Sequence, residues 1–338
     1  MITRSRREVQ SNESVTRISQ TIGDRSALAS ALDLPLERLA YSDAADALFR
    51  MKAPASFVAR IDPADPSDPL LRQILPRHQE TETVAGYEDD PVGDLAAGRV
   101  PGLIHKYAGR ALLIVTGACA IHCRYCFRRN YPYRKQRLDV EQACDYLSRK
   151  TGIREVILSG GDPLTLSNQR LVKLIEALER IPHLTTLRIH SRIPVVAPER
   201  LDPDLLALLG QGRLKRVVVI HANHPNELGA SARAACQALS EQGAMLLNQS
   251  VLLRGVNDCA ETLAALSLRL FEAGVLPYYL HLLDHARGVA HFDIPREEAR
   301  ALHDALCAQL PGYLVPRLVE EIPGERSKRV IAGEPAGS

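Results

Sequence analysis

The sequence predicts an α/β fold, a partial (β/α)6 barrel preceded by an N-terminal helical extension. Two observations support this prediction. From about residue 111 onward, six short apolar segments alternate with segments whose apolar residues recur at helical spacing. Each apolar segment also ends in a polar loop, and in parallel barrels the chemistry lies at such strand ends. The length of 338 residues is compatible with one barrel-like domain and an appendage.

Three regions are predicted along the chain. Residues 1–95 are polar, with helical patches such as 26–39 and a Pro/Asp-rich stretch at 60–80, and form the N-terminal helical extension and connector. Residues 96–310 form the barrel core. Residues 311–338 form a C-terminal segment.

The predicted strands are short apolar runs bounded by small or polar residues, and they comprise 111–119, 155–163, 186–192, 216–224, 244–255 and 276–284. The predicted helices between and after them comprise 138–149, 168–181, 203–212, 227–243 and 261–274. In the first of these helices, Asp139 is expected to be the N-cap, with Gln142 three residues later. This alternation indicates a parallel sheet.

Composition excludes several classes of protein. The net charge of +2, from 42 basic and 40 acidic residues, gives no reason to expect nucleic-acid binding. No apolar run reaches 18 residues and no secretory signal is evident, so a membrane partner is not expected. Three of the seven cysteines are clustered and four are scattered, which is not a disulfide framework and favours a reducing, cytoplasmic compartment.

The clustered cysteines, Cys119, Cys123 and Cys126, follow the first predicted strand with the spacing C-x3-C-x2-C. A structural zinc site or a closed iron–sulfur cluster normally takes four protein ligands. Three thiolates can instead hold three irons of a [4Fe–4S] cluster and leave the fourth iron open. A zinc site completed by His122 or His105 is the alternative.

A glycine pair, Gly160-Gly161, ends the second predicted strand and is followed by Asp162. Glycines let a backbone approach a ligand closely, and free N–H and C=O groups can bind the charged ends of an amino acid. A simple strand-to-helix turn is the alternative for this loop.

The cysteine spacing resembles the signature of the radical S-adenosylmethionine superfamily, in which the Gly-Gly loop holds the amino group of that cofactor. The resemblance implies that Gly160, Gly161 and Asp162 contact S-adenosylmethionine. Over residues 100–328 the chain resembles lysine 2,3-aminomutase in six segments that occur in order: CRYCFRRN, SGGDPL, HSRIPVV, HANHPNE, NQSVLLRGVND and PYYLHLLD. The resemblance implies an isomerase that moves the amino group of L-lysine from the α to the β carbon. It also implies a radical-SAM barrel with a [4Fe–4S] cluster, S-adenosylmethionine and pyridoxal phosphate.

The resemblance assigns roles to five further residues. Lys328, in the segment PGERSKR, takes the place of the lysine that binds pyridoxal phosphate, and Arg110 lies near that cofactor. Arg128 clasps the substrate carboxylate. Asp284 binds the side-chain ammonium together with Glu321, which replaces the aspartate typical of the family. Without the resemblance, Lys328 would be interpreted as a surface lysine and Arg128 as a solvated arginine.

The chain stops ten residues after Lys328, whereas free-lysine aminomutases continue well past this point. It therefore resembles the branch of the family that supplies (R)-β-lysine to the ligase of elongation factor P. We expect conversion of L-lysine to (R)-β-lysine for that modification, with a one-electron donor protein as partner. The alternatives are a metabolic 2,3-aminomutase for lysine or another amino acid, a radical SAM enzyme without pyridoxal phosphate, and a non-catalytic iron–sulfur module.

Overall fold

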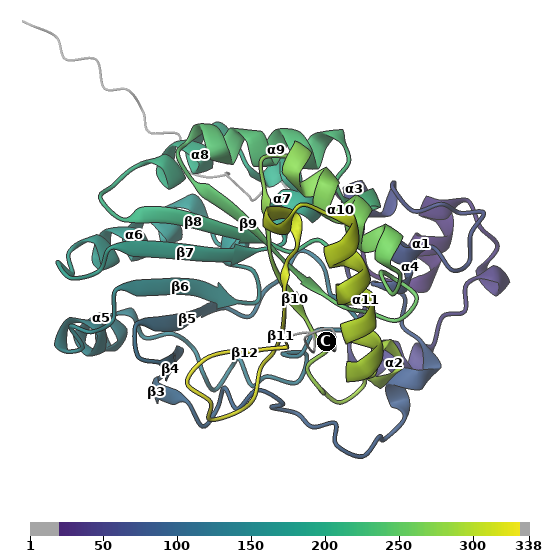
Figure 1. The fold of residues 1–338 in the computed structure, drawn as a ribbon, viewed down its shortest axis with the longest axis horizontal. Helices are drawn as coiled ribbons and strands as arrows, with labels where there is room; N and C mark the ends of the chain where they lie inside the picture. Colours follow the sequence, from purple (N-terminus) through teal and green to yellow (C-terminus); the bar gives the residue numbers. More distant parts are fainter. Residues whose placement is uncertain (1–19, 332–338) are drawn as a thin grey trace, which may run out of the picture.

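The computed structural model describes residues 20–331, and one curved ten-stranded sheet runs through its centre (Figure 1). In spatial order, its strands are β12 (Arg329–Val330), β11 (Arg317–Glu320), β10 (Leu276–His281), β9 (Met245–Val251), β8 (Lys215–Ile220), β7 (Thr186–Ser191), β6 (Glu155–Gly160), β5 (Arg110–Thr116), β4 (Leu103–Tyr107) and β3 (Gly98–Val100). Neighbouring strands from β5 to β11 are parallel, and the other pairs are antiparallel. The two edges, β12 and β3, do not pair, so the barrel is partial.

The six predicted parallel strands are confirmed as β5 to β10. The sheet also contains a seventh parallel strand, β11, which pairs with β10. The antiparallel strands β3, β4 and β12 were not predicted either. They are short, and β4 carries the polar sequence HKY in its second half, so none of them shows the apolar run of a buried strand.

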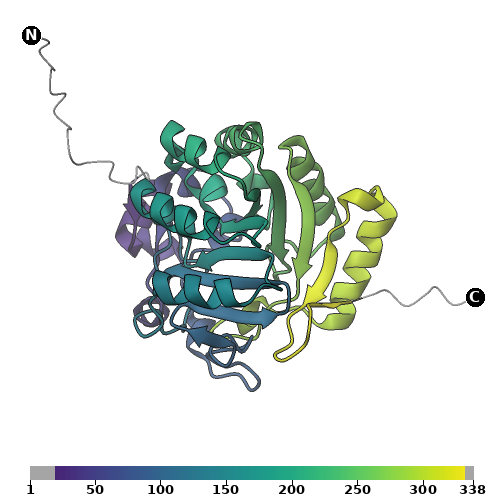
Figure 2. The same cartoon turned by 90° about the vertical axis from the view of Figure 1, so that its left-hand side faces the viewer.

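The long helices lie on the outer side of the curved sheet (Figure 2). They are α5 (Val140–Arg149), α6 (Asn168–Glu179), α8 (Pro203–Gly210), α9 (Ala230–Glu241), α10 (Ala260–Glu272) and α11 (Arg296–Gln309). The side chain of Asp139 accepts a hydrogen bond of 3.0 Å from the backbone N–H of Gln142, as expected for the N-cap of α5. The last helix, α11, was not predicted.

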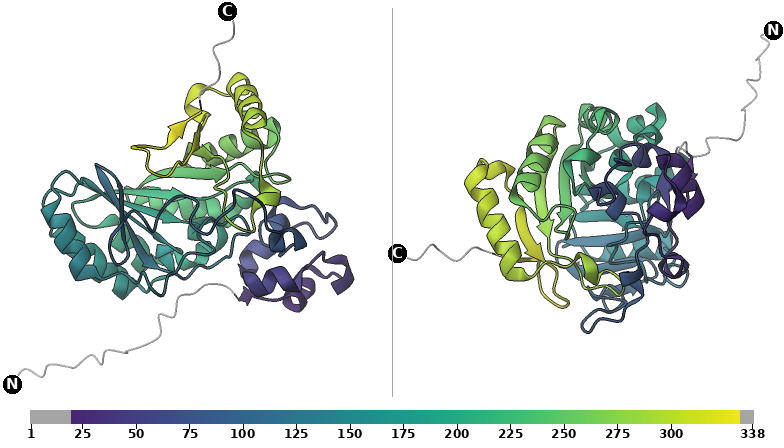
Figure 3. Two further views of the ribbon diagram at one scale, coloured as in Figure 1. Left: turned by 90° about the horizontal axis from the view of Figure 1, so that it is seen from below. Right: turned by 90° about the vertical axis from the view of Figure 1, so that its right-hand side faces the viewer.

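The N-terminal segment packs at the end of the sheet toward which β5 to β8 point (Figures 1 and 3). Its elements are β1 (Thr21–Ile22), α1 (Arg25–Leu32), α2 (Asp43–Leu48), β2 (Ala53–Pro54), α3 (Ala55–Val58) and α4 (Pro69–Arg72). Leu28, Phe57 and Ile74 belong to the same buried hydrophobic cluster as Leu158 of β6 and Ile189 of β7. The segment therefore shares its core with the barrel.

The remaining short elements connect these parts: α7 (Ile193–Val196), η1 (Leu36–Arg38), η2 (His78–Thr81), η3 (Pro163–Thr165), η4 (Pro198–Arg200), η5 (Pro225–Glu227), η6 (Ala290–Phe292) and η7 (Gly312–Leu314). The division at residues 95 and 310 stays a prediction, and β11 and β12 show that the last region continues the sheet. Residues 1–19 of the first predicted region and residues 332–338 of the last lie outside the described residues. Across residues 20–331, the helices are too short or too polar to cross a membrane.

Candidate active site

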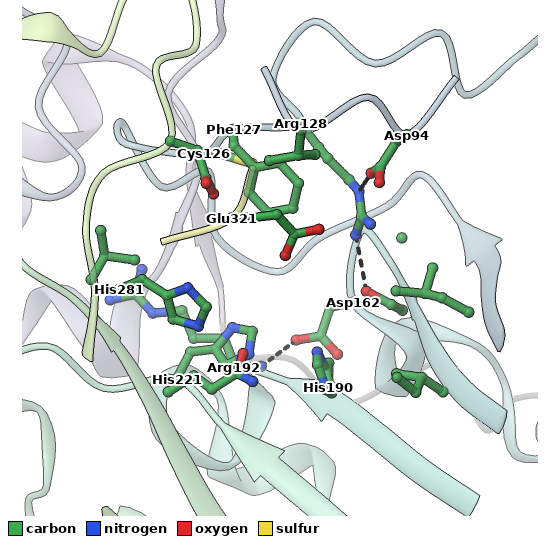
Figure 4. A pocket seen from close by; sticks show the side chains of 18 of the residues that line it. Asp94, Cys126, Phe127, Arg128, Asp162, His190, Arg192, His221, His281 and Glu321 are labelled. Atoms are coloured by element: carbon green, nitrogen blue, oxygen red, sulfur yellow. Dashed lines mark hydrogen bonds and ion pairs between the residues drawn. The ribbon is translucent and has the colours of Figure 1, made fainter. Parts of the chain in front are cut away.

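One cavity is lined by every predicted site residue. Figure 4 shows Cys126, Arg128, Asp162 and Glu321 in its wall. Its lining includes Arg110, Cys119, Cys123, Cys126, Arg128, Gly160, Gly161, Asp162, Asp284, Glu321 and Lys328. The free volume, including the part open to solvent, is about 1720 Å³.

The cysteine loop is held in place by the N-terminal segment. The side chain of Lys52 donates a 2.8 Å hydrogen bond to the backbone carbonyl of Cys119. The backbone N–H of His122 donates to the carbonyl of Lys52 at 2.8 Å, and that of Arg124 donates to the carbonyl of Gln73 at 2.9 Å. These bonds fix the backbone on both sides of Cys123, so the extension has a structural role that its sequence did not reveal.

A buried ion triad strengthens the same contact. Glu80 accepts from the side chain of Arg124 and, at 2.8 Å, from that of Arg129, and all three side chains are almost fully buried. Arg124 also donates to the backbone carbonyl of Phe49. Because an uncompensated charge would be left in the interior if one partner were lost, this triad ties the cysteine loop firmly to the segment before it.

The three thiols lie in an environment that fits a metal cluster. Burial, and then the neighbouring thiolates, raise the pKa of Cys119 well above its usual range, and burial with Cys123 raises the pKa of Cys126 to about 11. A bound cationic cluster would relieve this penalty and deprotonate the thiols. The guanidinium of Arg192 approaches the sulfur of Cys123 at 2.8 Å and is a further positive charge at the site.

Among residues 20–331, no three His, Cys, Asp or Glu side chains converge on a single metal ion. This arrangement does not support the alternative of a zinc site completed by His122 or His105. The ring N–H of His122 donates instead to the backbone carbonyl of Arg50, and His105 contacts the hydroxyl of Tyr146. A [4Fe–4S] cluster places one thiolate on each iron, so it does not require the sulfurs to meet at one point.

The glycine pair is required by its contact with the cysteine loop. Gly160 has a φ of +118°, and a Cβ there would lie 2.4 Å from the carbonyl oxygen of Thr116. A Cβ on Gly161 would lie 2.3 Å from the carbonyl oxygen of Ala118. Only glycine fits at both positions. The pair thus brings the end of β6 directly against the loop that carries the cysteines.

The carboxylate of Asp162 is engaged by protein donors. It accepts from the Ser191 hydroxyl and the Arg192 backbone N–H, each at 2.7 Å, and from the N–H groups of Leu164 and Ile193. Burial raises its pKa, and these hydrogen bonds oppose that change. Asp162 therefore braces the end of β6 against the loop after β7 (Figure 4). Its predicted cofactor contact stays a prediction.

A chain of alternating charges crosses the cavity wall. Arg128 pairs with Asp94 at 2.8 Å, Asp94 with Lys106 at 2.7 Å, and Lys106 with Glu321 at 2.9 Å. The other carboxylate oxygen of Glu321 pairs with Lys328. Arg128 also donates to the hydroxyl of Ser159 at 3.1 Å. The two predicted ends of the substrate site are therefore connected through Asp94 and Lys106, which were not predicted.

The two acidic residues predicted to bind an ammonium differ in their electrostatics. Burial favours the neutral form of Glu321, but the charges of Lys328 and Lys106 lower its pKa to about 2. Asp284 forms no side-chain hydrogen bond or ion pair within residues 20–331, and burial raises its pKa to about 6. An unpaired, partly buried carboxyl group that lines a cavity is suited to a cationic ligand.

Two further arginines, Arg110 and Arg188, line the cavity. The guanidinium of Arg110 lies 4.2 Å from the ring centre of Tyr107 and is paired with no carboxylate of residues 20–331. Arg188 lies nearby, paired with Glu155, and both arginines act electrostatically on the hydroxyl of Tyr278. A free guanidinium in a cavity fits a phosphate, so the residues present fit the predicted pyridoxal phosphate.

Three histidines complete the lining, His190, His221 and His281 (Figure 4). Burial lowers the pKa of each, to about 4 for His221, so all three are neutral at neutral pH. The Nε2 atom of each is buried without a hydrogen-bond partner. Such orphaned polar atoms are unfavourable unless a ligand supplies a partner, which indicates a cavity built for a polar ligand.

Sequence reasoning missed the histidines although a signal was present. They lie in the segments HSRIPVV, HANHPNE and PYYLHLLD, at or directly after strand ends, where functional side chains are expected. Asp94 and Lys106 had no such signal, because they precede the first parallel strand and Glu321, a partner of Lys106, is far away in sequence.

Comparisons with known proteins agree with this geometry. A family model described as the radical SAM superfamily matches residues 113–264. The chain is 43% identical to an L-lysine 2,3-aminomutase of Haemophilus influenzae, over 94% of this chain and 95% of that protein. It is also 43% identical to that of Escherichia coli, over 93% of both chains. The Clostridium subterminale protein of the same name is 38% identical, over 83% of this chain and 68% of its own.

Proposed function

The chain belongs to the L-lysine 2,3-aminomutase family of radical SAM isomerases, and on this premise we propose that it converts L-lysine into (R)-β-lysine. One observation carries the proposal. Residues spread from Arg110 to Lys328 line a single cavity, and they include three thiols, an unpaired guanidinium, a lysine and two carboxyl groups. A non-catalytic iron–sulfur module would not require a substrate pocket with Arg128 at one end and Asp284 and Glu321 at the other.

We propose that Cys119, Cys123 and Cys126 hold a [4Fe–4S] cluster and that the Gly160–Gly161 backbone contacts S-adenosylmethionine. Lys328 would bind pyridoxal phosphate, whose phosphate Arg110 would neutralise. When bound, the cluster and S-adenosylmethionine supply the radical that abstracts hydrogen, and pyridoxal phosphate supplies the carbonyl that carries the migrating amino group.

The chain itself binds, orients and shields the substrate. Arg128 is held in position by Asp94 and Ser159, and its guanidinium would donate hydrogen bonds to the substrate carboxylate. Asp284 and Glu321 would receive the side-chain ammonium. The three neutral histidines have unpartnered nitrogens with which to hydrogen-bond polar groups of a bound cofactor. Their burial helps to keep water away from a radical.

The reaction can be tested anaerobically. The protein with a reconstituted cluster is given pyridoxal phosphate, S-adenosylmethionine, dithionite and L-lysine, and the product is identified by chiral chromatography. We expect (R)-β-lysine, and none when S-adenosylmethionine is left out. Formation of 5′-deoxyadenosine without β-lysine would contradict lysine as the substrate.

We also propose that the product serves the β-lysylation of elongation factor P. The resemblance of VPGLIHKYAGRALLIVTGACAIHCRYCFRRNYP to that branch supports this role. The proposal predicts that cells with an inactive enzyme contain elongation factor P without its β-lysyl group, as measured by mass spectrometry. Normal modification in such cells would instead favour a metabolic use of β-lysine.

Asp284→Asn is expected to stabilise the lysine-free protein at neutral pH. The pKa of Asp284 in the folded protein, about 6, lies above its ordinary value of 3.8. Its contribution to stability is therefore fully present below about pH 4, where the carboxyl group is neutral in both the folded and the unfolded protein. That contribution is lost as the pH rises through 6, and the ionised carboxylate destabilises the fold by at most about 3 kcal/mol. The variant should gain about 1–3 kcal/mol in free energy of unfolding at pH 7.5, measured with urea.

The same variant should raise KM for lysine, because the carboxylate that would pair with the ammonium is gone. Asp304→Asn, on the exposed side of α11, is the matched control and should change neither quantity. A gain in stability that is equally large at pH 5 and pH 7.5 would contradict the assignment.

A further inference from the structure

We propose that Lys106 sets the length of amino acid that the cavity accepts, because it holds the carboxylate-binding and ammonium-binding ends at a fixed separation. This inference rests on the proposed function, which places Arg128 at one end of the substrate and Glu321 at the other. Lys106 lies on β4, on the cavity wall between them.

The bridge consists of direct ion pairs. Lys106 contacts Asp94 at 2.7 Å and Glu321 at 2.9 Å, and Asp94 contacts the Nε atom of Arg128 at 2.8 Å. Each link uses a different carboxylate oxygen of Asp94, so Arg128 and Lys106 do not compete for it. Lys106 is therefore the side chain that links Arg128, through Asp94, to Glu321.

Lys106 itself is not available to a ligand. Its ammonium has three N–H groups. They face three acceptors, which are the carboxylates of Asp94 and Glu321 and the backbone carbonyl of Val92 at 2.7 Å. A saturated ammonium with three partners in different directions cannot turn toward a substrate. Lys106 is thus a positioning residue that acts through Arg128 and Glu321.

Burial makes the bridge stiff. The side chains of Asp94 and Arg128 are 3% and 9% exposed, and those of Lys106 and Glu321 are 15% and 12% exposed. Ion pairs shielded from water are weakly screened, so they resist stretching more than surface pairs do. Removing Lys106 still leaves Asp94 paired with Arg128. Glu321 pairs with Lys328 in the structure, and once Lys328 has bound pyridoxal phosphate, the substrate ammonium would take its place. Loss of Lys106 should therefore free the spacing without leaving an unpaired carboxylate.

Fixed ends discriminate by chain length. An amino acid with one methylene fewer than lysine, such as L-ornithine, cannot engage both Arg128 and Glu321 unless one of them moves. A mismatch of one methylene typically changes selectivity about 10-fold to 200-fold. With the bridge cut, Glu321 can shift toward a shorter side chain, and the preference for lysine should decrease.

The test compares the wild-type holoenzyme with Lys106→Met, which keeps the length of the side chain but removes its charge. Binding of L-lysine and L-ornithine is measured from the change that each causes in the visible absorbance of bound pyridoxal phosphate, and kcat and KM are measured for lysine. We expect the binding preference for lysine over ornithine to fall about tenfold. KM for lysine should rise more than kcat falls.

Lys215→Met, at the exposed start of β8, is the matched control. It should leave the binding preference and both kinetic constants for lysine unchanged. Lys106→Arg keeps a charge that can span the two carboxylates and should restore most of the preference. If Lys106→Met does not take up its cofactors, Lys106→Gln is used in its place. We expect the same fall in the binding preference for lysine over ornithine.

An unchanged lysine-to-ornithine binding ratio in a loaded Lys106 variant would overturn the inference. Failure of the wild-type enzyme to make β-lysine would overturn the proposed function instead, so the two failures are distinguishable.

Discussion

Cys126→Ala is expected to abolish cleavage of S-adenosylmethionine. The Cys126 thiol is buried beside Cys123 in the wall of the cavity, and two remaining cysteines cannot hold three irons. Loss of a residue that only hydrogen-bonds to a metal ligand typically lowers metal affinity or activity about 10-fold to 100-fold. Loss of a ligand itself should therefore have a larger effect. The measurements are iron content, the visible spectrum of the reconstituted protein and the yield of 5′-deoxyadenosine.

Cys307→Ala is the matched control, because Cys307 is exposed on α11 and lies outside the cavity. It should retain full iron content and cleavage. Normal deoxyadenosine formation by Cys126→Ala would exclude the proposed cluster site.

Lys328→Ala is expected to remove the visible absorbance of bound pyridoxal phosphate and to stop formation of β-lysine. Lys328 lines the cavity, where its side chain pairs with Glu321 and its charge acts on Asp284 and His281. Loss of an essential covalent group typically lowers kcat by at least about 1,000-fold. Iron content should stay normal, because the cysteine loop makes no contact with Lys328.

Lys173→Ala, on the exposed side of α6, is the control for this change and should keep both the absorbance and the activity. If Lys328→Ala kept the cofactor absorbance, another lysine would have to hold pyridoxal phosphate. If neither Lys328→Ala nor Lys173→Ala bound pyridoxal phosphate, the alternative of a radical SAM enzyme without that cofactor would be favoured.

Much of the barrel could be predicted because local signals and the fold agree. Strands β5, β6 and β8 contain apolar runs such as VVVI in β8, as is typical of strands covered on both faces of a parallel sheet. Their helices carry regular apolar faces, as in α6 with Leu171, Leu174 and Leu178. By contrast, β3, β4, β11 and β12 are short or polar, and they form only because the sheet offers an edge to pair with.

The site residues could be identified one by one from motifs, yet their mutual contacts could not. The spacing of Cys119, Cys123 and Cys126 is a local pattern that a sequence displays directly. The pairing of Lys106 with Glu321 joins β4 to the segment after β11, and no local pattern reports a contact across such a distance. The same holds for Glu80 with Arg124, which ties the extension to the cysteine loop.

The parallel sheet, the three-cysteine motif, the family resemblance and the candidate residues at the strand ends can thus be recognised from the order of the amino acids. Three features are seen only in the folded chain: the N-terminal segment holds the cysteine loop, three neutral histidines line the cavity, and Lys106 connects Arg128, through Asp94, to Glu321. The physical reason is that hydrophobic periodicity and motif spacing act over a few residues. Burial, pKa and ion pairing depend on which distant segments the fold brings together.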